Sequence, residues 1–338
     1  MKAYVLEEVN KLQYKEVPVP ECKSGWAIVK VKAAGICSSD ISRIFTKGTY
    51  HFPTIPGHEF SGIVSQVKDK KDSSWIGKHV GIFPLIPCKN CLQCKEKHYE
   101  MCSSYDYIGS RRDGAFAEYV AVPIWNLIEI PNSITFTQAA MLEPLAVGLH
   151  ACKIADINLN SKVAIVGTGM IGISAAQWAK SMGTKNVCVI GRNENKRNLV
   201  KKNQIYYINQ TIEEVKDDYN VVIEAVGDPN SIDIAINCTM PGGTLVLMGN
   251  PSSNITLTQN TYWRILRKQL KLHGTWNSSY QGTLPSDWTK AVNALSNNII
   301  HVENLITHCF SQENLMQGLT LMKEHKNTYC KVMTIWNK

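Results

Sequence analysis

The stretch KVAIVGTGMIG (162–172) joins an apolar, β-branched run to the pattern Gly-x-Gly-x-x-Gly. Residues from about 170 to 182 then have the apolar spacing of a helix. A strand, a glycine turn and a helix in this order are what a dinucleotide-binding fingerprint requires. The first glycine permits the tight turn, the second admits a pyrophosphate to backbone N–H groups, and the third lets the helix lie close to the strand. The residues we predict to bind the cofactor here are Gly167, Gly169, Met170, Ile171 and Gly172.

The rhythm of strand and helix continues towards the C-terminus. NVCVI (186–190) precedes a basic helical segment over about 194–203. The buried-strand runs that follow are VVIEAVG (221–227), TLVLMG (244–249) and LKLHGTW (270–276). Alternating strands and helices predict an α/β fold with a parallel, doubly wound Rossmann sheet, which we place at residues 148–283.

The residues before this domain differ from it in composition and in the spacing of apolar residues. Short β-like runs such as MKAYVLEE, WAIVKVKAAGI and HEFSGIVSQV are punctuated by Gly and Pro, which predicts a compact β-rich lobe. Residues 133–155 have helical spacing, with Pro144 at the first position of a new helical segment. We assign residues 1–147 to this lobe and expect the tail, 284–338, to rejoin it.

Composition excludes several classes of protein. Of 338 residues, 44% are hydrophobic and 19% charged, as in a folded chain of one or two domains. The net charge of +8 favours anionic small molecules, but no basic block predicts nucleic-acid binding. The chain shows neither a secretory signal at its N-terminus nor a run of eighteen apolar residues. We therefore expect a cytoplasmic protein with no nucleic-acid or membrane partner.

Four of the eleven cysteines lie in CKNCLQCKEKHYEMC (88–102), spaced as Cys88-x2-Cys91-x2-Cys94-x7-Cys102. In a reducing compartment such a cluster indicates a metal site more often than disulfides. The two-residue spacings let one loop direct several thiolates to a common centre, as tetrahedral zinc requires. Because all four ligands are sulfur, no position is left open for substrate. We predict a structural zinc, with reduced loop cysteines as the alternative.

Three further segments contain residue types that bind metals. They are GICSSD (35–40) with Cys37, PGHEFSG (56–62) with His58 and Glu59, and MLEPLAV (141–147) with Glu143. Each residue alone also fits an ordinary role, as a core thiol, a turn histidine, or a surface or capping acid. Only their combination with the cysteine loop and the nucleotide fold points to a catalytic site.

With these segments, the sequence resembles the zinc-dependent medium-chain dehydrogenase/reductase family over nearly its whole length. The resemblance also includes DGAFAEY (113–119) and EPLAVGLHA (143–151). Within the family, the sequence is most similar to polyol dehydrogenases that act on phosphorylated sugar alcohols such as galactitol 1-phosphate. The stretches that carry this closer match are SRIFTKGTYHFP (42–53), YIGSRRDGAFAEY (107–119) and ILRKQLKLHGTW (265–276).

The resemblance implies a GroES-like catalytic lobe, a Rossmann lobe and an active site between them. It implies that Cys37, His58 and Glu143 bind a catalytic zinc, so that each chain holds two zinc ions. Glu59 is then either a fourth ligand or one that exchanges with water, and Ser39 relays the alcohol proton. Zinc acidifies a bound alcohol, from which hydride passes to the nicotinamide. We also expect a homodimer or homotetramer.

Two positions depart from the family pattern. Ser38 stands where glycine is common, and it is a small residue that the site should tolerate. Ser42 stands where some relatives have a histidine that completes the proton relay, so the later proton path stays open.

The predicted substrate is a sugar alcohol, most specifically a polyol phosphate that is oxidised to the ketose phosphate. An unphosphorylated, sorbitol-like polyol, a pentitol phosphate and L-threonine are the alternatives. Four cations are candidate partners of a substrate phosphate, since guanidinium groups donate to phosphate in a fixed fork. They are Arg43, Lys47, Arg111 and Arg112, and each of them also fits a surface or inter-lobe salt bridge.

The end of the second Rossmann strand predicts the cofactor. In NAD-preferring folds an acid there binds the adenosine ribose hydroxyls. Here the acid is replaced by Gly191, while Arg192 can pair with a 2′-phosphate, Asn193 can donate to it, and Arg197 adds positive potential. We predict a preference for NADP(H) over NAD(H), which Gly191→Asp with Arg192→Ile should shift towards NAD. The alternative is that Arg192 points to solvent and that NAD, or both cofactors, are used.

Two non-enzymatic functions compete with this interpretation. A zinc-ribbon module that binds nucleic acid would need a basic, aromatic surface around the cysteine loop, and it leaves the glycine motif unexplained. A dinucleotide-binding sensor would tend to lack the ligands of the catalytic zinc.

Overall fold

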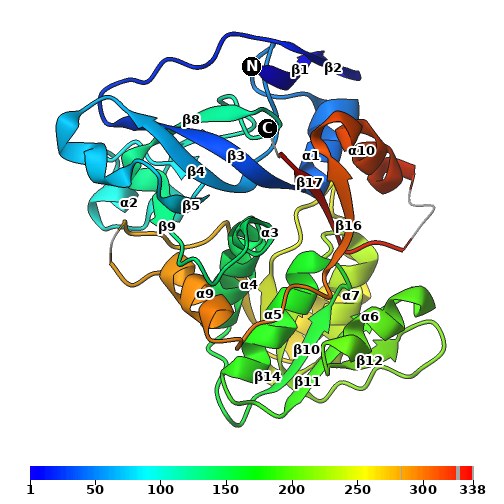
Figure 1. Ribbon diagram of the computed structural model, residues 1–338. Coiled ribbons are helices and arrows are strands. Elements are labelled where there is room, and N and C mark those ends of the chain that lie inside the picture. Colours follow the sequence, from blue (N-terminus) through cyan, green and yellow to red (C-terminus); the bar gives the residue numbers. More distant parts are fainter. Residues whose placement is uncertain (283, 325–327, 337–338) are drawn as a thin grey trace. The chain divides into compact units, whose positions relative to one another are not determined.

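The computed structural model describes residues 1–282, 284–324 and 328–336 (Figure 1). The chain forms two compact units. Unit 1 comprises Met1–Glu143, Ser279–Asn297 and Ile306–Lys338, and unit 2 comprises Pro144–Ser278 and Asn298–Leu305. The main divisions thus lie at 143/144 and 278/279, a few residues from the predicted 147/148 and 283/284. Residues 298–305, which the sequence assigned to the first lobe, belong to unit 2.

Unit 2 contains a parallel six-stranded sheet, which confirms the predicted doubly wound fold. In spatial order its strands are β12 (Tyr206–Asn209), β11 (Asn186–Gly191), β10 (Lys162–Val166), β13 (Tyr219–Glu224), β14 (Thr239–Leu247) and β15 (Lys271–Gly274). The order reverses between β10 and β13, which is where ligands bind in open sheets of this kind. Strand β12 was not predicted, because its four residues are too few to show a pattern.

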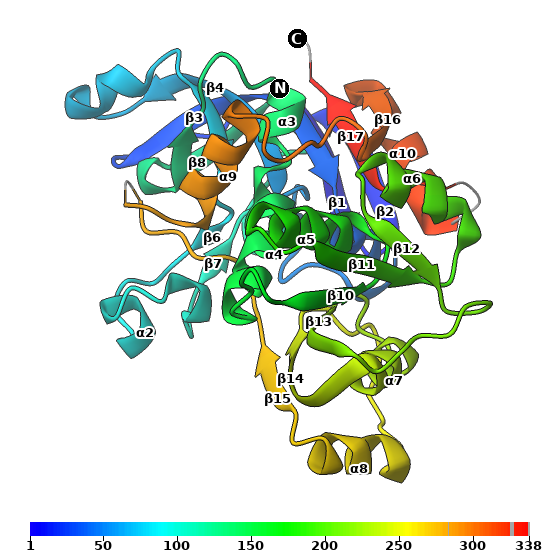
Figure 2. The same cartoon turned by 90° about the horizontal axis from the view of Figure 1, so that it is seen from below.

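Both faces of this sheet are covered by helices. Along β10, Val163 and Ile165 point to one face and Ala164 and Val166 to the other, and all four are buried. Helix α5 (Met170–Ser181) and helix α7 (Pro229–Cys238) lie on opposite faces (Figure 2). The other helical segments of unit 2 are α4 (Leu142–Ile154, beginning in unit 1), η5 (Glu194–Lys196), α6 (Arg197–Lys202) and α8 (Gln259–Arg267). Covering both faces leaves the loops at the strand ends to bind ligands.

Pro144, predicted to begin a helical segment, lies in the first turn of α4, which begins at Leu142. The first N–H groups of a helix have no intrahelical partner, so proline loses nothing there.

Unit 1 is built on a seven-stranded sheet. In spatial order it contains β16 (Ile306–Ser311), β17 (Lys331–Ile335), β3 (Trp26–Ile36), β4 (Glu59–Val67), β5 (His79–Ile82) and β9 (Leu127–Glu129), with β8 (Tyr119–Pro123) also paired to β3. Two-stranded sheets are formed by β1 (Lys2–Glu8) with β2 (Lys11–Glu16), and by β6 (Leu85–Ile86) with β7 (Asp106–Tyr107). Strand β3 pairs with both β4 and β17, so it joins early and late parts of the chain.

The helices of unit 1 are short. They are α1 (Ser38–Ser42), η1 (Arg43–Lys47), η2 (Lys70–Trp75), α2 (Leu92–Lys95), η3 (Tyr99–Met101), η4 (Ile124–Asn126), α3 (Phe136–Ala139), α9 (Asp287–Ser296), η6 (Gln312–Asn314) and α10 (Leu315–Glu324). The core of unit 1 includes Val29, Ile36, Leu319 and Val332, all buried.

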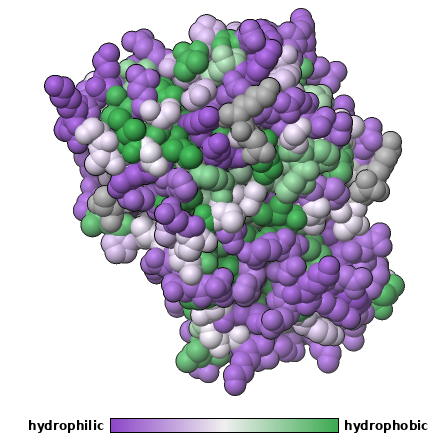
Figure 3. Space-filling view, in the orientation of Figure 1, coloured by the Kyte–Doolittle hydropathy of each residue, from purple (hydrophilic) through white to green (hydrophobic). Residues whose placement is uncertain are grey.

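Exposed hydrophobic side chains of unit 2 gather at one edge of its sheet. Hydrophilic residues predominate on the face of unit 2 that Figure 3 shows. On α8 and around β15, by contrast, Tyr262, Trp263, Leu266, Leu272 and Trp276 are exposed. Among the described residues, none of the helices is long and apolar enough to cross a membrane.

Candidate metal and nucleotide sites

The four loop cysteines bring their sulfur atoms together, with all Sγ atoms within 4.8 Å of one another. Cys88 Sγ lies 3.9 Å from Cys94 Sγ, and Cys91 Sγ lies 3.9 Å from Cys102 Sγ. A tetrahedron with zinc–sulfur bonds of about 2.3 Å has edges of about 3.8 Å, whereas a disulfide bond measures about 2.05 Å. The spacing therefore fits four ligands around one ion.

Backbone amides surround these sulfur atoms. Asn90 N and Cys91 N donate to Cys88 Sγ at 3.5 and 3.4 Å, and Cys88 N donates to Cys102 Sγ at 3.3 Å. The N–H groups of Cys94 and Ser103 lower the pKa of Cys91 to about 6. Donors of this kind stabilise the thiolate, which is the form that binds a metal.

The second candidate cluster consists of Cys37, His58 and Glu59, whose ligand atoms also lie within 4.8 Å of one another. Cys37 follows β3 and caps α1, while Glu59 begins β4. The pairing of Gly35 with Glu59 across these strands brings the three residues together. A Cβ atom at position 35 would collide with the Glu59 side chain, so the glycine of GICSSD makes room for this carboxylate. One thiolate, one imidazole and a carboxylate match the ligands of a catalytic zinc.

Two residues that sequence analysis missed support this cluster. His58 Nδ1 lies 3.3 Å from Asp40 Oδ1, and Cys37 N donates to Asp40 Oδ2 at 3.0 Å. Because Nδ1 faces this carboxylate, Nε2 is the ring nitrogen that could bind a metal. Lys331, from β17, forms a buried ion pair with Glu59 and donates to Ile36 O at 3.4 Å. Glu59 therefore already has a cationic partner.

Glu143 is buried beside the cluster, although its carboxylate is not among the three groups within 4.8 Å. Tyr107 OH donates to Glu143 Oε1 at 3.5 Å. Burial, and then the charge of Glu59, raise the pKa of Glu143 to about 7. Two neighbouring buried carboxylates fit a site that holds a divalent cation. That Glu143 binds zinc stays a prediction.

Ser39, the predicted proton relay, is held by Arg43. Arg43 Nη1 donates to Ser39 Oγ at 2.9 Å and lies 3.7 Å from Asp40 Oδ1. Because a guanidinium only donates, Ser39 accepts this bond and keeps its own hydrogen for another acceptor. Arg43 thus orients the hydroxyl and does not carry the proton.

The four predicted phosphate partners separate into two groups. Arg43 adjoins the Cys37–His58–Glu59 cluster, and Lys47, one turn further along, is exposed. Arg111 and Arg112 instead line a cavity of about 830 Å³ whose lining residues include none of that cluster.

Both arginines of this cavity have other partners. Arg112 pairs with Asp106, and the Arg111 guanidinium lies 3.8 Å from the centre of the Tyr50 ring and 4.8 Å from that of Tyr105. These contacts favour the structural alternative for Arg111 and Arg112.

The glycine motif forms the turn between β10 and α5. Gly167 has a φ of +128°, which a side chain would disfavour. A Cβ atom at Gly169 would meet nothing within 4 Å, so this side of the loop is open to a ligand. A Cβ atom at Gly172 would collide with Gly167 O. Met170 and Ile171 begin α5, so the turn has the geometry that binds a pyrophosphate at a helix N-terminus.

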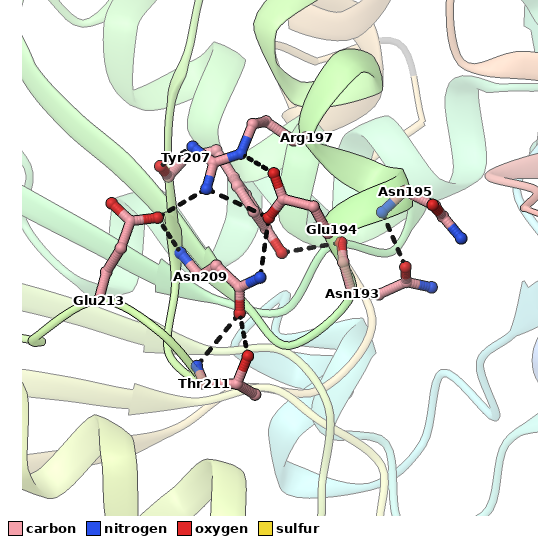
Figure 4. A network of polar contacts seen from close by, with 8 residues as sticks. All are labelled: Asn193, Glu194, Asn195, Arg197, Tyr207, Asn209, Thr211 and Glu213. Carbon is pink, nitrogen blue, oxygen red and sulfur yellow. Dashed lines mark hydrogen bonds and ion pairs between the residues drawn. The ribbon is translucent and has the colours of Figure 1, made fainter.

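The residues after β11 are only partly arranged as predicted (Figure 4). Gly191 is buried at the strand end, and Arg192 and Asn193 are exposed. Arg197, in contrast, forms ion pairs with Glu194 and Glu213, the latter with 2.6 Å between Nη2 and Oε1. Two carboxylates neutralise this guanidinium, so it contributes less positive potential at the strand end than the sequence predicts.

The missed residues differ in how well the sequence signals them. Asp40 lies three residues after Cys37, and an acid there could have been proposed as the partner of a ligand histidine. Lys331 and Tyr107 have no local signal, because only strand pairing and loop packing bring them to the cluster.

Family comparisons agree with this geometry. Residues 23–132 match the alcohol dehydrogenase GroES-like domain, and residues 171–297 match the zinc-binding dehydrogenase family. Galactitol 1-phosphate 5-dehydrogenase of Escherichia coli (strain K12) is 33% identical over 332 residues, covering 94% of this chain and 95% of the relative.

Solved structures match over almost the whole chain. The crystal structure of galactitol-1-phosphate dehydrogenase from Escherichia coli has a TM-score of 0.92 at 32% identity, covering 99% of this chain and 100% of that one. A putative zinc-binding dehydrogenase from Sinorhizobium meliloti 1021, bound to NADP, has a TM-score of 0.90 at 27% identity, covering 99% and 98%.

These matches define the chain as a zinc-dependent oxidoreductase with a GroES-like and a Rossmann part. It belongs to the zinc-dependent medium-chain dehydrogenase/reductase family, among the alcohol and polyol dehydrogenases.

Proposed function

We propose that this dehydrogenase oxidises a polyol phosphate, of the type of galactitol 1-phosphate, to the ketose phosphate, with two zinc ions per chain. The observation that supports a phosphorylated substrate is the position of Arg43, a half-buried cation next to the candidate catalytic cluster. The similarity to galactitol 1-phosphate 5-dehydrogenase supports the same substrate class. A sorbitol-like polyol, a pentitol phosphate and L-threonine are the alternatives.

In this proposal each side chain of the site has a separate role in the reaction. Cys37, His58 and Glu143 would hold the catalytic zinc, which would supply a Lewis acid for the alcohol or carbonyl oxygen of the substrate. Asp40 holds the His58 ring in position, and Ser39 Oγ takes up the alcohol proton. For the exit of that proton beyond Ser39, the structure offers no histidine at position 42.

The phosphate assignment predicts discrimination between substrates. We expect kcat/KM for galactitol 1-phosphate to exceed that for galactitol and sorbitol by about 100-fold, since charge-assisted hydrogen bonds contribute about 1.5–3 kcal/mol each. Arg43→Met should reduce this ratio at least tenfold. Arg112→Met is the matched control, because Arg112 lines the cavity of about 830 Å³ that contains none of the Cys37–His58–Glu59 cluster, and it should leave the ratio unchanged. Equal use of free and phosphorylated polyols would refute the phosphate site.

We further propose a preference for NADP(H) over NAD(H). Gly191 leaves the strand end without the acid that repels a 2′-phosphate, and Arg192 and Asn193 are exposed beside it. We expect kcat/KM to favour NADP⁺ by at least tenfold and Arg192→Met to reduce that ratio about tenfold. Lys202→Met, at the far end of α6, is the control that removes an equal charge. A wild type that strongly favours NAD⁺ contradicts the proposal.

A homodimer or homotetramer stays a prediction. The fully exposed strand β15 and the hydrophobic residues on α8 support it, because an unpaired sheet edge invites pairing. The cytoplasmic location likewise stays a prediction from the sequence.

A further inference from the structure

The space beside Gly191 is closed, although the sequence gives no sign of it. A Cβ atom at this position would lie 2.5 Å from Thr168 Cγ2, and 3.1 Å from both Cε2 and OH of Tyr207. Thr168 can relieve its contact by rotating about its Cα–Cβ bond, at a cost of the order of a rotamer change. The Tyr207 ring is fully buried and has no such freedom. A side chain at position 191 therefore needs Thr168 to rotate away, and it then still presses on the Tyr207 ring, which has no room to give.

Several contacts hold the Tyr207 ring in place (Figure 4). Tyr207 OH donates to Asn193 O at 2.9 Å, which ties the ring to the loop after β11. The Arg197 guanidinium lies over the ring, 5.0 Å from its centre. Arg197 is itself fixed by its ion pairs with Glu194 and Glu213. The network thus uses Arg197 to position an aromatic ring.

The same network also fixes the end of strand β12, where the next loop begins. Asn209 Nδ2 donates to Glu194 Oε2 at 2.8 Å, and Asn209 N donates to Glu213 Oε1 at 3.0 Å. The two carboxylates that pair with Arg197 are therefore both hydrogen-bonded to Asn209, which ends the strand that carries Tyr207. A shift of the ring would have to break this set of bonds.

We propose that Tyr207 is a specificity-determining residue: its ring keeps a carboxylate out of position 191, and so excludes the group that would favour NAD⁺ over NADP⁺. The proposal deepens the NADP(H) preference and rests on it for its biological meaning. It also changes the outcome expected for Gly191→Asp with Arg192→Ile, which should fail to produce an NAD⁺-preferring protein while Tyr207 is present.

The test measures equilibrium binding of NAD⁺ and NADP⁺ by calorimetry, together with the thermal midpoint of the cofactor-free, zinc-loaded protein. Three variants are compared: Gly191→Asp alone, Gly191→Asp combined with Tyr207→Leu, and Gly191→Asp combined with Tyr206→Leu. Tyr206 is the matched control, since it is the neighbouring residue of β12 and is 63% exposed. The single variant should lose NADP⁺ affinity without gaining NAD⁺ affinity. With Tyr207→Leu it should bind NAD⁺ at least about tenfold more tightly than alone, because the new carboxylate can then reach the ribose hydroxyls. With Tyr206→Leu it should behave like the single variant.

The proposal would be overturned if Gly191→Asp alone gained as much NAD⁺ affinity as Gly191→Asp with Tyr207→Leu. It would also be overturned if Tyr206→Leu produced the same gain as Tyr207→Leu. Gly191→Ala gives a second test that does not depend on the stability of Tyr207→Leu. Its methyl group should lower the thermal midpoint and weaken both cofactors, and a neutral or stabilising effect would show that the space is open. Wild-type affinities decide the NADP(H) preference separately, since a protein that prefers NAD⁺ refutes that preference without affecting the coupling between positions 191 and 207.

Discussion

Replacing Cys37 by serine should abolish turnover while leaving the fold and cofactor binding intact. A hydroxyl is a poor substitute for a thiolate ligand, so the variant should lose the ion of the Cys37–His58–Glu59 cluster. A catalytic metal supplies several kcal/mol of transition-state stabilisation, and we expect kcat/KM to fall by about 10³-fold or more. Metal analysis should show about one zinc per chain in the variant and two in the wild type.

Cys309→Ser is the matched control for this prediction, because Cys309 is an exposed cysteine of unit 1 outside both clusters. It should keep two zinc ions and full activity. Calorimetric titration with the cofactor should give the same Kd for the wild type and both variants, since the glycine turn lies in unit 2. Wild-type turnover by Cys37→Ser would refute the assignment of the catalytic metal.

The second large effect concerns the structural zinc. Cys94 is buried in the 88–102 loop, and Cys94→Ser should remove the ion that this loop encloses. Zinc binding contributes about 10–16 kcal/mol in zinc-finger peptides, so losing even part of it should lower the thermal midpoint by roughly 10 °C or more. Limited proteolysis should then cut within the loop.

Cys22→Ser is the matched control, since Cys22 is buried and belongs to neither of the two candidate metal clusters. It should change neither the zinc content nor the cleavage pattern. A Cys94→Ser protein that retains two zinc ions, or resists cleavage like the wild type, would show that the loop does not need the metal.

Features with a local, regularly spaced signal could be predicted from the sequence. The β10 run, the glycine turn and the cysteine loop each lie within about fifteen residues, and their chemistry follows from spacing alone. The predicted ligands Cys37 and His58 needed the family resemblance, because 20 residues separate them and only the pairing of β3 with β4 makes them neighbours.

The remaining features depend on packing between distant segments. Nothing in the sequence near Arg197 indicates that Glu213 will neutralise it, so the basic helical segment predicted only added positive potential. Gly191 likewise looked like a vacant position from which the acid had been removed. In the structure the space beside it is filled by Thr168 and by the ring of Tyr207 from the next strand.

The ion pair between Lys331 and Glu59 has a consequence for the order in which the protein matures. Synthesis proceeds at about 5–20 residues per second, and domains generally fold as units as they emerge. Residues 144–278 are made well before Lys331, so most of unit 2 can fold while unit 1 still lacks β17. Glu59 can acquire its lysine, and β3 its partner β17, only after residues 331–335 have been made. A metal bound by Cys37 and His58 would therefore enter a completed site only after β17 has been made and has paired with β3.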